Sequence, residues 1–237
     1  MNSADQRFAL VVPTINEVAN IKVLLDRAVT ALSRLPIPWE IIVVDDESSD
    51  GTPDIARRFA ESESRVRLLI RAGQKGLAGA IAYGWAQTDA DLLGVIDADL
   101  QHPPELLPTL INKVSDGCDI AIASRYVQPH SIEGWSPLRA AISRMTLLAS
   151  KPVQKPFLAV KDPMSGFFVL RRKCISGLEF QPTGFKLLLE ILGRGQISSV
   201  TEVPFKFVPR HQGKSKANLM TAVHYLSLLW RLTFKSG

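Results

Sequence analysis

Two aspartates and a glutamine lie close together in the segment Asp97-Ala98-Asp99-Leu100-Gln101. They follow an apolar run that is typical of a buried strand, so two carboxylates and an amide oxygen are predicted at a strand end. Oxygen ligands of this kind suit Mg²⁺ or Mn²⁺, which retains water and accepts phosphate oxygens from a substrate. Such an ion would neutralise the charge that develops on a departing diphosphate. Because Asp-x-Asp is a common sequence, a solvated acidic turn is the alternative interpretation of this segment alone.

A second group of acidic residues lies where another predicted strand opens into a helix. A carboxylate at this point could accept hydrogen bonds from ribose hydroxyls or from the edge of a base. Acidic residues near a helix N-terminus also stabilise the helix, by about 0.3–1 kcal/mol each. Helix capping explains Asp50 and Asp54 well but explains Asp45 and Asp46 poorly, which favours a binding role for the last two. Thr52 is the predicted N-cap of the helix that follows.

The first predicted strand is followed by Pro-Thr-Ile-Asn-Glu at residues 13–17. Dinucleotide-binding dehydrogenases carry a Gly-x-Gly-x-x-Gly turn at this point, so the sequence argues against that class. Glycines occur later, at residues 73–79, where they either bring the backbone close to a nucleotide or permit a tight turn. Isolated arginines such as Arg71 and Arg172 are interpreted as surface residues that keep the protein soluble.

The elements that must position these residues alternate along the chain. The predicted strands are 8–12, 40–44, 66–70, 92–96 and 120–123, and helical spacing is found at 21–32, after residue 52, at 77–85 and at 106–114. Such alternation is typical of an α/β fold with a largely parallel sheet, in which ligands bind beyond the carboxyl ends of the strands. A chain of 237 residues, 46% of them apolar, can bury one such core. Short strands near 167–170 and 200–207 are expected to belong to the acceptor side.

Charge and cysteine content narrow the class of protein further. The net charge of +5 favours an anionic partner, which could be nucleic acid, a phospholipid surface or a phosphorylated small molecule. Cys118 and Cys174 are far apart and neither lies in a Cys-x-x-Cys pair, so we expect two buried, reduced thiols and no zinc site. The N-terminus lacks the pattern of a secretory signal peptide, and we expect the protein to stay in the cytosol.

The C-terminal segment combines an apolar stripe with basic residues. Its longest apolar stretch, at 219–230, is interrupted by polar residues and is shorter than a membrane span. Trp230 and the flanking lysines and arginines predict an amphipathic helix at a membrane interface. A helix that packs its apolar face on the core is the alternative.

Several segments in order resemble the family-2 glycosyltransferases of GT-A fold: residues 13–17, the Val-Val-Asp-Asp strand end at 43–46, Asp-Gly-Thr at 50–52 and Asp-Ala-Asp-Leu-Gln at 97–101. Further segments resemble the polyprenol (dolichyl) phosphate mannosyltransferases within that group: Ser-Arg-Tyr at 124–126, Arg139 with Ser143, Asp-Pro-Met-Ser-Gly-Phe-Phe at 162–168 and Arg-His-Gln-Gly-Lys-Ser-Lys at 210–216. The resemblance covers about residues 11–230. It implies a Rossmann-like GT-A fold, with a mixed, largely parallel sheet flanked by helices. The implied reaction is inverting transfer of mannose from GDP-mannose to a polyprenyl phosphate.

The resemblance also implies a role for each matched residue. The residues implied in nucleotide-sugar binding are Pro13, Ile15, Glu17, Val44, Asp46, Asp97, Ala98, Asp99, Arg125, Arg210 and Lys216. The residues implied in catalysis are Asp97, Arg125, Arg139, Ser143 and Arg210, and those implied in holding Mg²⁺ or Mn²⁺ are Asp99 and Gln101. Arg125, Arg139 and Ser143 stand at positions that bind a phosphate of donor or acceptor. Arg210 and Lys216 match a loop that closes over the donor.

These implications predict the organisation and location of the protein. We expect a GT-A catalytic domain at 1–217, with a nucleotide-binding part at about 1–125 and an acceptor part at about 126–217, followed by the interface helix at 218–237. The expected partners are a nucleotide sugar, a polyprenyl phosphate lipid and a membrane surface, and no nucleic acid. We expect the protein on the cytoplasmic side of a membrane, held peripherally, by a membrane-anchoring partner or by membrane helices absent from this chain.

The sequence departs from the family pattern at Ile15, Ala78 and Glu47 and leaves rivals open. The family often has an aromatic residue where Ile15 stands, and a glycine where Ala78 stands. The nearest rival is a polyprenyl phosphate glucosyltransferase that uses UDP-glucose. A nucleotidyltransferase would be expected to carry a basic loop after its first strand, and residues 13–17 are not basic. A non-catalytic nucleotide-sugar-binding module on the same fold is the last alternative.

Overall fold

The computed structural model describes residues 6–73, 75–128, 147, 150, 158–180 and 186–206, and within them seven strands form one sheet in the order β3-β2-β1-β4-β6-β5-β7. The strands are β1 (Phe8–Thr14), β2 (Trp39–Asp45), β3 (Val66–Ile70), β4 (Leu92–Val95), β5 (Ile120–Ser124), β6 (Phe168–Arg171) and β7 (Val200–Pro204). β6 runs antiparallel to β4 and β5, and the other described pairings are parallel. The predicted mixed, largely parallel sheet is confirmed. The strands expected on the acceptor side, β6 and β7, are part of this same sheet.

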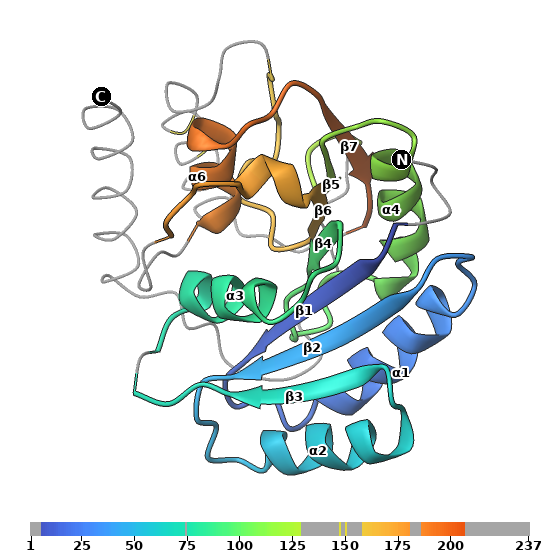
Figure 1. The fold of residues 1–237 in the computed structure, drawn as a ribbon, viewed down its shortest axis with the longest axis vertical. Helices are drawn as coiled ribbons and strands as arrows, with labels where there is room; N and C mark the ends of the chain where they lie inside the picture. The colour runs from blue at the N-terminus through green and yellow to red at the C-terminus, as the bar shows by residue number, and fades with distance from the viewer. Residues whose placement is uncertain are drawn as a thin grey trace.

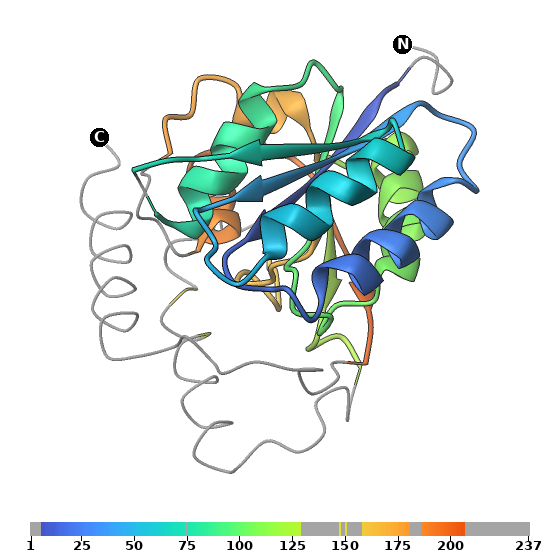
Figure 2. The same cartoon turned by 90° about the horizontal axis from the view of Figure 1, so that it is seen from below.

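Helices cover both faces of the sheet (Figures 1 and 2). The helices are α1 (Ile21–Leu32), α2 (Thr52–Ser62), α3 (Leu77–Ala86), α4 (Leu107–Ser115) and α6 (Leu187–Arg194), with short 3₁₀ turns η2 (Pro104–Leu106) and η4 (Arg172–Ile175). Side chains of α1, α2 and α4 pack into one apolar cluster, and those of α3 and α6 pack into another on the opposite face. The α/β class is therefore confirmed, with one core on each side of a central sheet.

Strand β1 lies inside the sheet, between β2 and β4, and is covered by helices on both faces. All its residues are buried. Phe8 and Leu10 belong to the cluster around α1, whereas Ala9 and Val11 belong to the cluster around α3. Successive side chains of a strand point to opposite faces, so a strand covered by helices on both sides is apolar throughout. Burial of each large apolar side chain contributes about 1.5–3 kcal/mol, which makes β1 a rigid support for the loop that follows it.

The start of α2 differs by one residue from the prediction. Thr52 is the first helical residue, and Gly51 precedes it as N-cap with φ of 87°. The side chain of Asp50 accepts hydrogen bonds from the Thr52 N–H at 3.0 Å and from the Val18 N–H at 3.0 Å. Gly51 is needed here because its backbone lies in the left-handed region, which residues with a Cβ rarely adopt. Asp50 therefore stabilises the first turn of α2, as the sequence predicted, and also ties α2 to the loop after β1.

The remaining general predictions have mixed outcomes. Both cysteines are free; Cys174 is buried, but Cys118 is only half-buried, because it lies in the turn that leads into β5. In the described ranges, no helix combines the length and the apolar character that a membrane crossing requires. The predicted interface helix at 218–237 lies outside the described residues, and the division into nucleotide and acceptor parts stays a prediction.

Candidate active site

The loops that follow β1, β2 and β4 begin side by side, because these strands are parallel neighbours. The register pairs Thr14 of β1 with Asp45 of β2. Beyond the strand ends, the Asp46 N–H donates to the Thr14 carbonyl at 3.0 Å, and the Ile96 N–H donates to the Val11 carbonyl at 3.3 Å. The three segments that the sequence analysis singled out therefore meet at one edge of the sheet.

The loops after β1 and β2 are joined by a network of short hydrogen bonds. The Asn16 N–H donates to Ser48 Oγ at 2.7 Å, the Ser49 N–H donates to Asn16 Oδ1 at 2.9 Å, and the Glu17 N–H donates to Thr52 Oγ1 at 2.8 Å. Asn16 has a φ of 54°, a left-handed conformation that asparagine tolerates better than most residues. The described residues predicted to bind the nucleotide sugar are buried (Pro13, Val44, Asp46, Ala98, Asp99) or half-buried (Ile15, Glu17, Asp97, Arg125).

The buried side chain of Asp45 links the loops after β1 and β2 by further hydrogen bonds. Its carboxylate is fully buried and accepts hydrogen bonds from Thr14 Oγ1 at 2.8 Å, from the Ser48 N–H at 2.7 Å and from Ser48 Oγ at 2.6 Å. Buried carboxylates are stable only when their oxygens are satisfied in this way. Asp45 thus shapes the loop after β2, and the first acid of the Asp-Asp pair has a structural role.

Asp46, the second acid of the pair, is bound by Arg71. Nε and Nη2 of Arg71 donate to the two oxygens of Asp46 at 2.7 and 2.6 Å, and the Gly76 N–H donates to Oδ2 at 2.8 Å. Arg71 Nη2 also donates to the Gly76 carbonyl at 2.9 Å. The two side chains are only 10% and 7% exposed. The prediction that Arg71 is a solubilising surface residue is therefore wrong: it connects Asp46 to the glycine-rich segment before α3.

Arg172 is also not a surface residue of the kind predicted. Its guanidinium donates to the carbonyls of Ala90 at 2.7 Å and Thr88 at 2.8 Å. These carbonyls lie in the turn between α3 and β4, at the opposite end of β4 from the acidic residues. Arg172 therefore stabilises that turn and takes no direct part in the site.

The Asp97–Gln101 segment forms a tight turn after β4. The side chain of Asp99 is nearly buried, and its Oδ1 accepts a hydrogen bond from the Gln101 N–H at 3.1 Å. Leu100 between them has a φ of 60°, in the left-handed region. Asp97 is more open, with about a third of its side chain, 32%, exposed. Asp99 is thus held inside the turn, whereas the Asp97 carboxylate is partly accessible to solvent.

Arg125 lies at the end of β5 and is held by Asp162. Nε and Nη2 of Arg125 donate to the Asp162 carboxylate at 2.8 and 2.7 Å, and the Arg125 N–H donates to Oδ2 at 3.0 Å. Burial of the guanidinium lowers the pKa of Arg125, but the hydrogen-bonded Asp162, with help from Tyr126 and Asp97, outweighs this and raises the pKa overall. Arg125 therefore remains a cation close to Asp97.

Two further ionisable residues in this group were not recognised from the sequence. Burial lowers the pKa of Lys186 to about 8; Arg125 acts in the same direction, and Asp97 and Asp162 oppose it. Burial, again with Arg125, lowers the pKa of His102 to about 3. His102 Nδ1 lies 3.9 Å from Asp97 Oδ2, but at neutral pH this contact is no ion pair because the imidazole is uncharged. His102 could have been recognised as a site residue because it directly follows Gln101 in the sequence. Nothing in the sequence around Lys186, at the start of α6, indicates that it belongs to the site.

The other predicted site residues, Arg139, Ser143, Arg210 and Lys216, lie outside the described residues. The described ones fall into two groups on one edge of the sheet. Asp46 and its neighbours follow β1 and β2, and the group of Asp97, Asp99 and Arg125 follows β4 and β5.

The architecture is also found in solved glycosyltransferases. The structure of glucosyl-3-phosphoglycerate synthase from Mycobacterium tuberculosis with Mn²⁺, UDP-glucose and phosphoglyceric acid matches 98% of this chain and 81% of its own chain with a TM-score of 0.72, at 20% identity. The sheet and its flanking helices therefore have the GT-A fold. Residues 9–178 match the family described as glycosyl transferase family 2. The chain belongs to this family, as its motifs predicted.

Two curated relatives that match nearly the whole chain are dolichol-phosphate mannosyltransferases. The dolichol-phosphate mannosyltransferase of Pyrococcus furiosus is 41% identical over 226 residues, which cover 95% of this chain and 63% of the relative. The dolichol-phosphate mannosyltransferase of Saccharomyces cerevisiae is 32% identical, covering 97% of this chain and 88% of the relative. The chain thus spans less than two thirds of the length of the Pyrococcus enzyme.

Proposed function

We propose that this chain transfers mannose from GDP-mannose to a polyprenyl (dolichyl) phosphate with inversion at the anomeric carbon, giving polyprenyl phosphate mannose. The observation that carries the proposal is the 41% identity to a dolichol-phosphate mannosyltransferase over 95% of the chain. The site supports it, because acidic and basic groups suited to a nucleotide diphosphate sugar meet at one edge of the sheet. The nucleotide would bind beside Pro13, Val44 and Asp46.

A divalent ion is part of this proposal. Mg²⁺ in proteins is commonly held by one or two carboxylates together with substrate phosphates, and does not need a cage of protein ligands. The described part of the chain contains no cluster of three or more His, Cys, Asp or Glu side chains that could enclose an ion by themselves. We expect Asp99 and Gln101 to hold Mg²⁺ or Mn²⁺. When bound, the ion supplies charge stabilisation for the departing diphosphate.

The acceptor needs little activation by the protein. The second pKa of a phosphate monoester is about 6, so a polyprenyl phosphate already carries a nucleophilic anionic oxygen near neutral pH. This oxygen forms a bond to the anomeric carbon as the bond from that carbon to the GDP oxygen breaks, and the electron pair leaves with GDP. The contribution of the chain is to position the two reactants in line. Arg125 would bind a phosphate and Asp97 would orient the sugar.

The remaining roles fall on residues outside the described ranges. Arg139 and Ser143 would complete the phosphate site with Arg125, and Arg210 and Lys216 would close over the donor. The segment at 218–237 would place the enzyme against the cytoplasmic face of a membrane, where the lipid acceptor resides. A peripheral position of this kind agrees with its basic and apolar composition.

The test offers two labelled donors to the purified protein. Radiolabelled GDP-mannose and UDP-glucose are each incubated with a polyprenyl phosphate and Mn²⁺, and the lipid fraction is extracted and counted. We expect label in the lipid from GDP-mannose, and none when the metal is chelated. Label from UDP-glucose alone would assign the protein as a glucosyltransferase, and label from neither donor would reject the proposed activity.

A further inference from the structure

One turn of the chain, residues 162–166, contacts both Arg125 and Asp97 of the site. At its beginning, the fully buried carboxylate of Asp162 holds Arg125 through two side-chain hydrogen bonds and one backbone hydrogen bond. Asp162 is itself anchored, because its N–H donates to Glu202 Oε1 of β7 at 2.9 Å. The arginine is thus fixed to the end of the sheet through the first residue of the 162–166 turn.

At its end, the same turn lies directly against Asp97. A Cβ atom added to Gly166 would lie 2.0 Å from Asp97 Oδ2, 2.6 Å from Cγ and 2.9 Å from Oδ1, all far inside van der Waals contact. Gly166 is not among the described glycines with a positive φ. The position therefore excludes a side chain because the carboxylate of Asp97 fills the space, and the backbone conformation there places no demand on glycine.

Hydrogen bonds tie the end of the turn to β5. Ser165 Oγ donates to the Ala123 carbonyl of β5 at 2.7 Å, and the Phe167 N–H donates to Ser165 Oγ at 3.2 Å. The Ala123 N–H in turn donates to the Phe167 carbonyl at 2.9 Å. Since Ser165 is buried in this arrangement, a side chain at Gly166 would displace the carboxylate of Asp97 before it displaced the turn.

From these contacts we propose that the 162–166 turn sets the position of the Asp97 carboxylate relative to the Arg125 guanidinium, with Gly166 as the positioning residue for Asp97 and Asp162 as the positioning residue for Arg125. The catalytic consequence rests on the proposed function, because Asp97 would orient the sugar opposite the phosphate held by Arg125. The steric part of the proposal does not depend on which reaction the site performs.

The test is the substitution Gly166→Ala in the full chain. If GDP-mannose is the donor, we expect kcat to fall by about 100-fold, the loss that a displacement of about 1 Å can cause. The affinity for GDP with Mn²⁺, measured by calorimetry, is expected to be unchanged, because the proposed function places the nucleotide beside β1 and β2. An unchanged kcat, or equal losses of kcat and GDP affinity, would overturn the positioning role.

Two companion variants separate the steric effect from general damage. In an Asp97→Ala background the added methyl group has no carboxylate to displace, so Gly166→Ala should leave the melting temperature and any residual turnover as they are. Gly94→Ala is the matched control, because its Cβ would lie 2.6 Å from the ring of Phe8 in the core. It should lower the melting temperature while the folded fraction keeps its kcat.

Melting temperatures test the steric coupling between Gly166 and Asp97 even if the protein shows no transfer activity. If the wild type transfers label from neither donor, the proposed function fails, but a smaller melting-temperature change from Gly166→Ala in the Asp97→Ala background than in the wild type still supports the steric coupling. Folding of Gly166→Ala only in the Asp97→Ala background supports it as well. Equal changes in both backgrounds, or failure to fold in both, would contradict it.

Discussion

Arg71 and Asp46 form a buried ion pair across the ends of β3 and β2, with two hydrogen bonds of 2.7 and 2.6 Å between the guanidinium and the carboxylate. The pair follows from the register, since Ile70 of β3 is the partner of Asp45 in β2 and each charged residue comes next in its chain. Arg71 also bonds to the Gly76 carbonyl, so the pair connects the proposed nucleotide pocket to the start of α3. The ion pair therefore helps to hold the proposed nucleotide pocket in shape.

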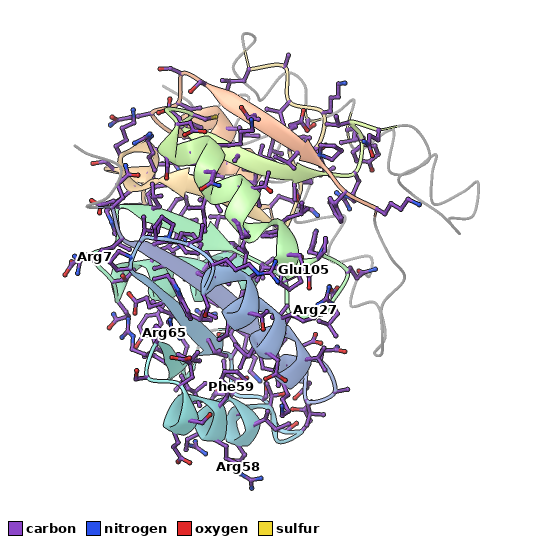
Figure 3. The ribbon with its side chains drawn as sticks, turned by 90° about the vertical axis from the view of Figure 1, so that its right-hand side faces the viewer. Arg7, Arg27, Arg58, Phe59, Arg65 and Glu105 are labelled. Carbon is purple, nitrogen blue, oxygen red and sulfur yellow. The ribbon has the colours of Figure 1, made fainter. Side chains whose placement is uncertain are left out.

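Removal of Arg71 should destabilise the fold considerably. In Arg71→Ala, the Asp46 carboxylate stays nearly buried without its cation, and breaking a buried pair in this way costs about 3–5 kcal/mol. Urea unfolding measures the change. The control is Arg27→Ala, which breaks the bidentate pair of α1 with Glu105 on the surface (Figure 3). Because these side chains are 37% and 56% exposed, a loss of about 0–1 kcal/mol is expected. Similar losses in both variants would contradict the importance of the Asp46 pair.

Asp99→Ala should remove transfer without unfolding the protein. If Asp99 holds the metal, loss of charge stabilisation on the leaving diphosphate should lower kcat by about 100- to 1,000-fold. Its side chain accepts a hydrogen bond from the Gln101 N–H, and the loss of that bond costs about 1 kcal/mol. Initial rates at several Mn²⁺ concentrations and thermal melting measure both effects. Asp54→Ala, at an exposed aspartate paired with Arg57, is the matched control. Undiminished turnover of Asp99→Ala would remove the metal assignment.

Lys186 should make the stability of the fold depend on pH in the alkaline range. Burial lowers its pKa from 10.5 to about 8, so between these values the unfolded chain binds more protons at this site than the folded protein does. Stability at this group therefore rises with pH from about 8 to 10.5, and the destabilising effect of the buried charge is fully present below pH 8. Lys186→Met should be more stable than the wild type at pH 7, by a margin that shrinks towards pH 10.

Unfolding of Lys186→Met and wild type across this pH range tests the prediction. Lys22→Met is the control, because Lys22 is 67% exposed and lies in a surface pair with Asp26. A stability difference for Lys186→Met that stays constant with pH would show that the ammonium keeps its ordinary pKa in the folded protein.

Much of the fold could be predicted because its signals are local. The predicted bounds of β1 to β5 lie within two residues of those in the structure, and α1 covers the same residues, 21–32, as the predicted helical spacing. Apolar runs and helical spacing report burial within one element, and their alternation reports parallel pairing. The acidic groups after β2 and β4 could be located for the same reason, since each follows its strand directly in the sequence.

The features that sequence reasoning missed depend on pairing between distant segments. β6 lies antiparallel between β4 and β5, although it follows β5 by more than forty residues in the chain. Arg71 and Asp46 are 25 residues apart, and Lys186 reaches the site from the start of α6. An isolated arginine or lysine has the same local pattern whether it is exposed or buried in an ion pair, so its partner becomes visible only once the strand order is known.

The pair of Arg125 and Asp162 should behave as one unit in stability measurements. Asp162 is fully buried and Arg125 is 16% exposed, so replacing either alone leaves a charge in a poorly solvated place. Arg125→Met and Asp162→Leu should each destabilise the fold by about 3 kcal/mol, whereas the double variant should lose less than the sum, with a coupling energy of about 2–3 kcal/mol. Urea unfolding of the four proteins completes the cycle. Additive losses would mean that Asp162 does not anchor Arg125, and the 162–166 turn would then have no hold on the phosphate side of the site.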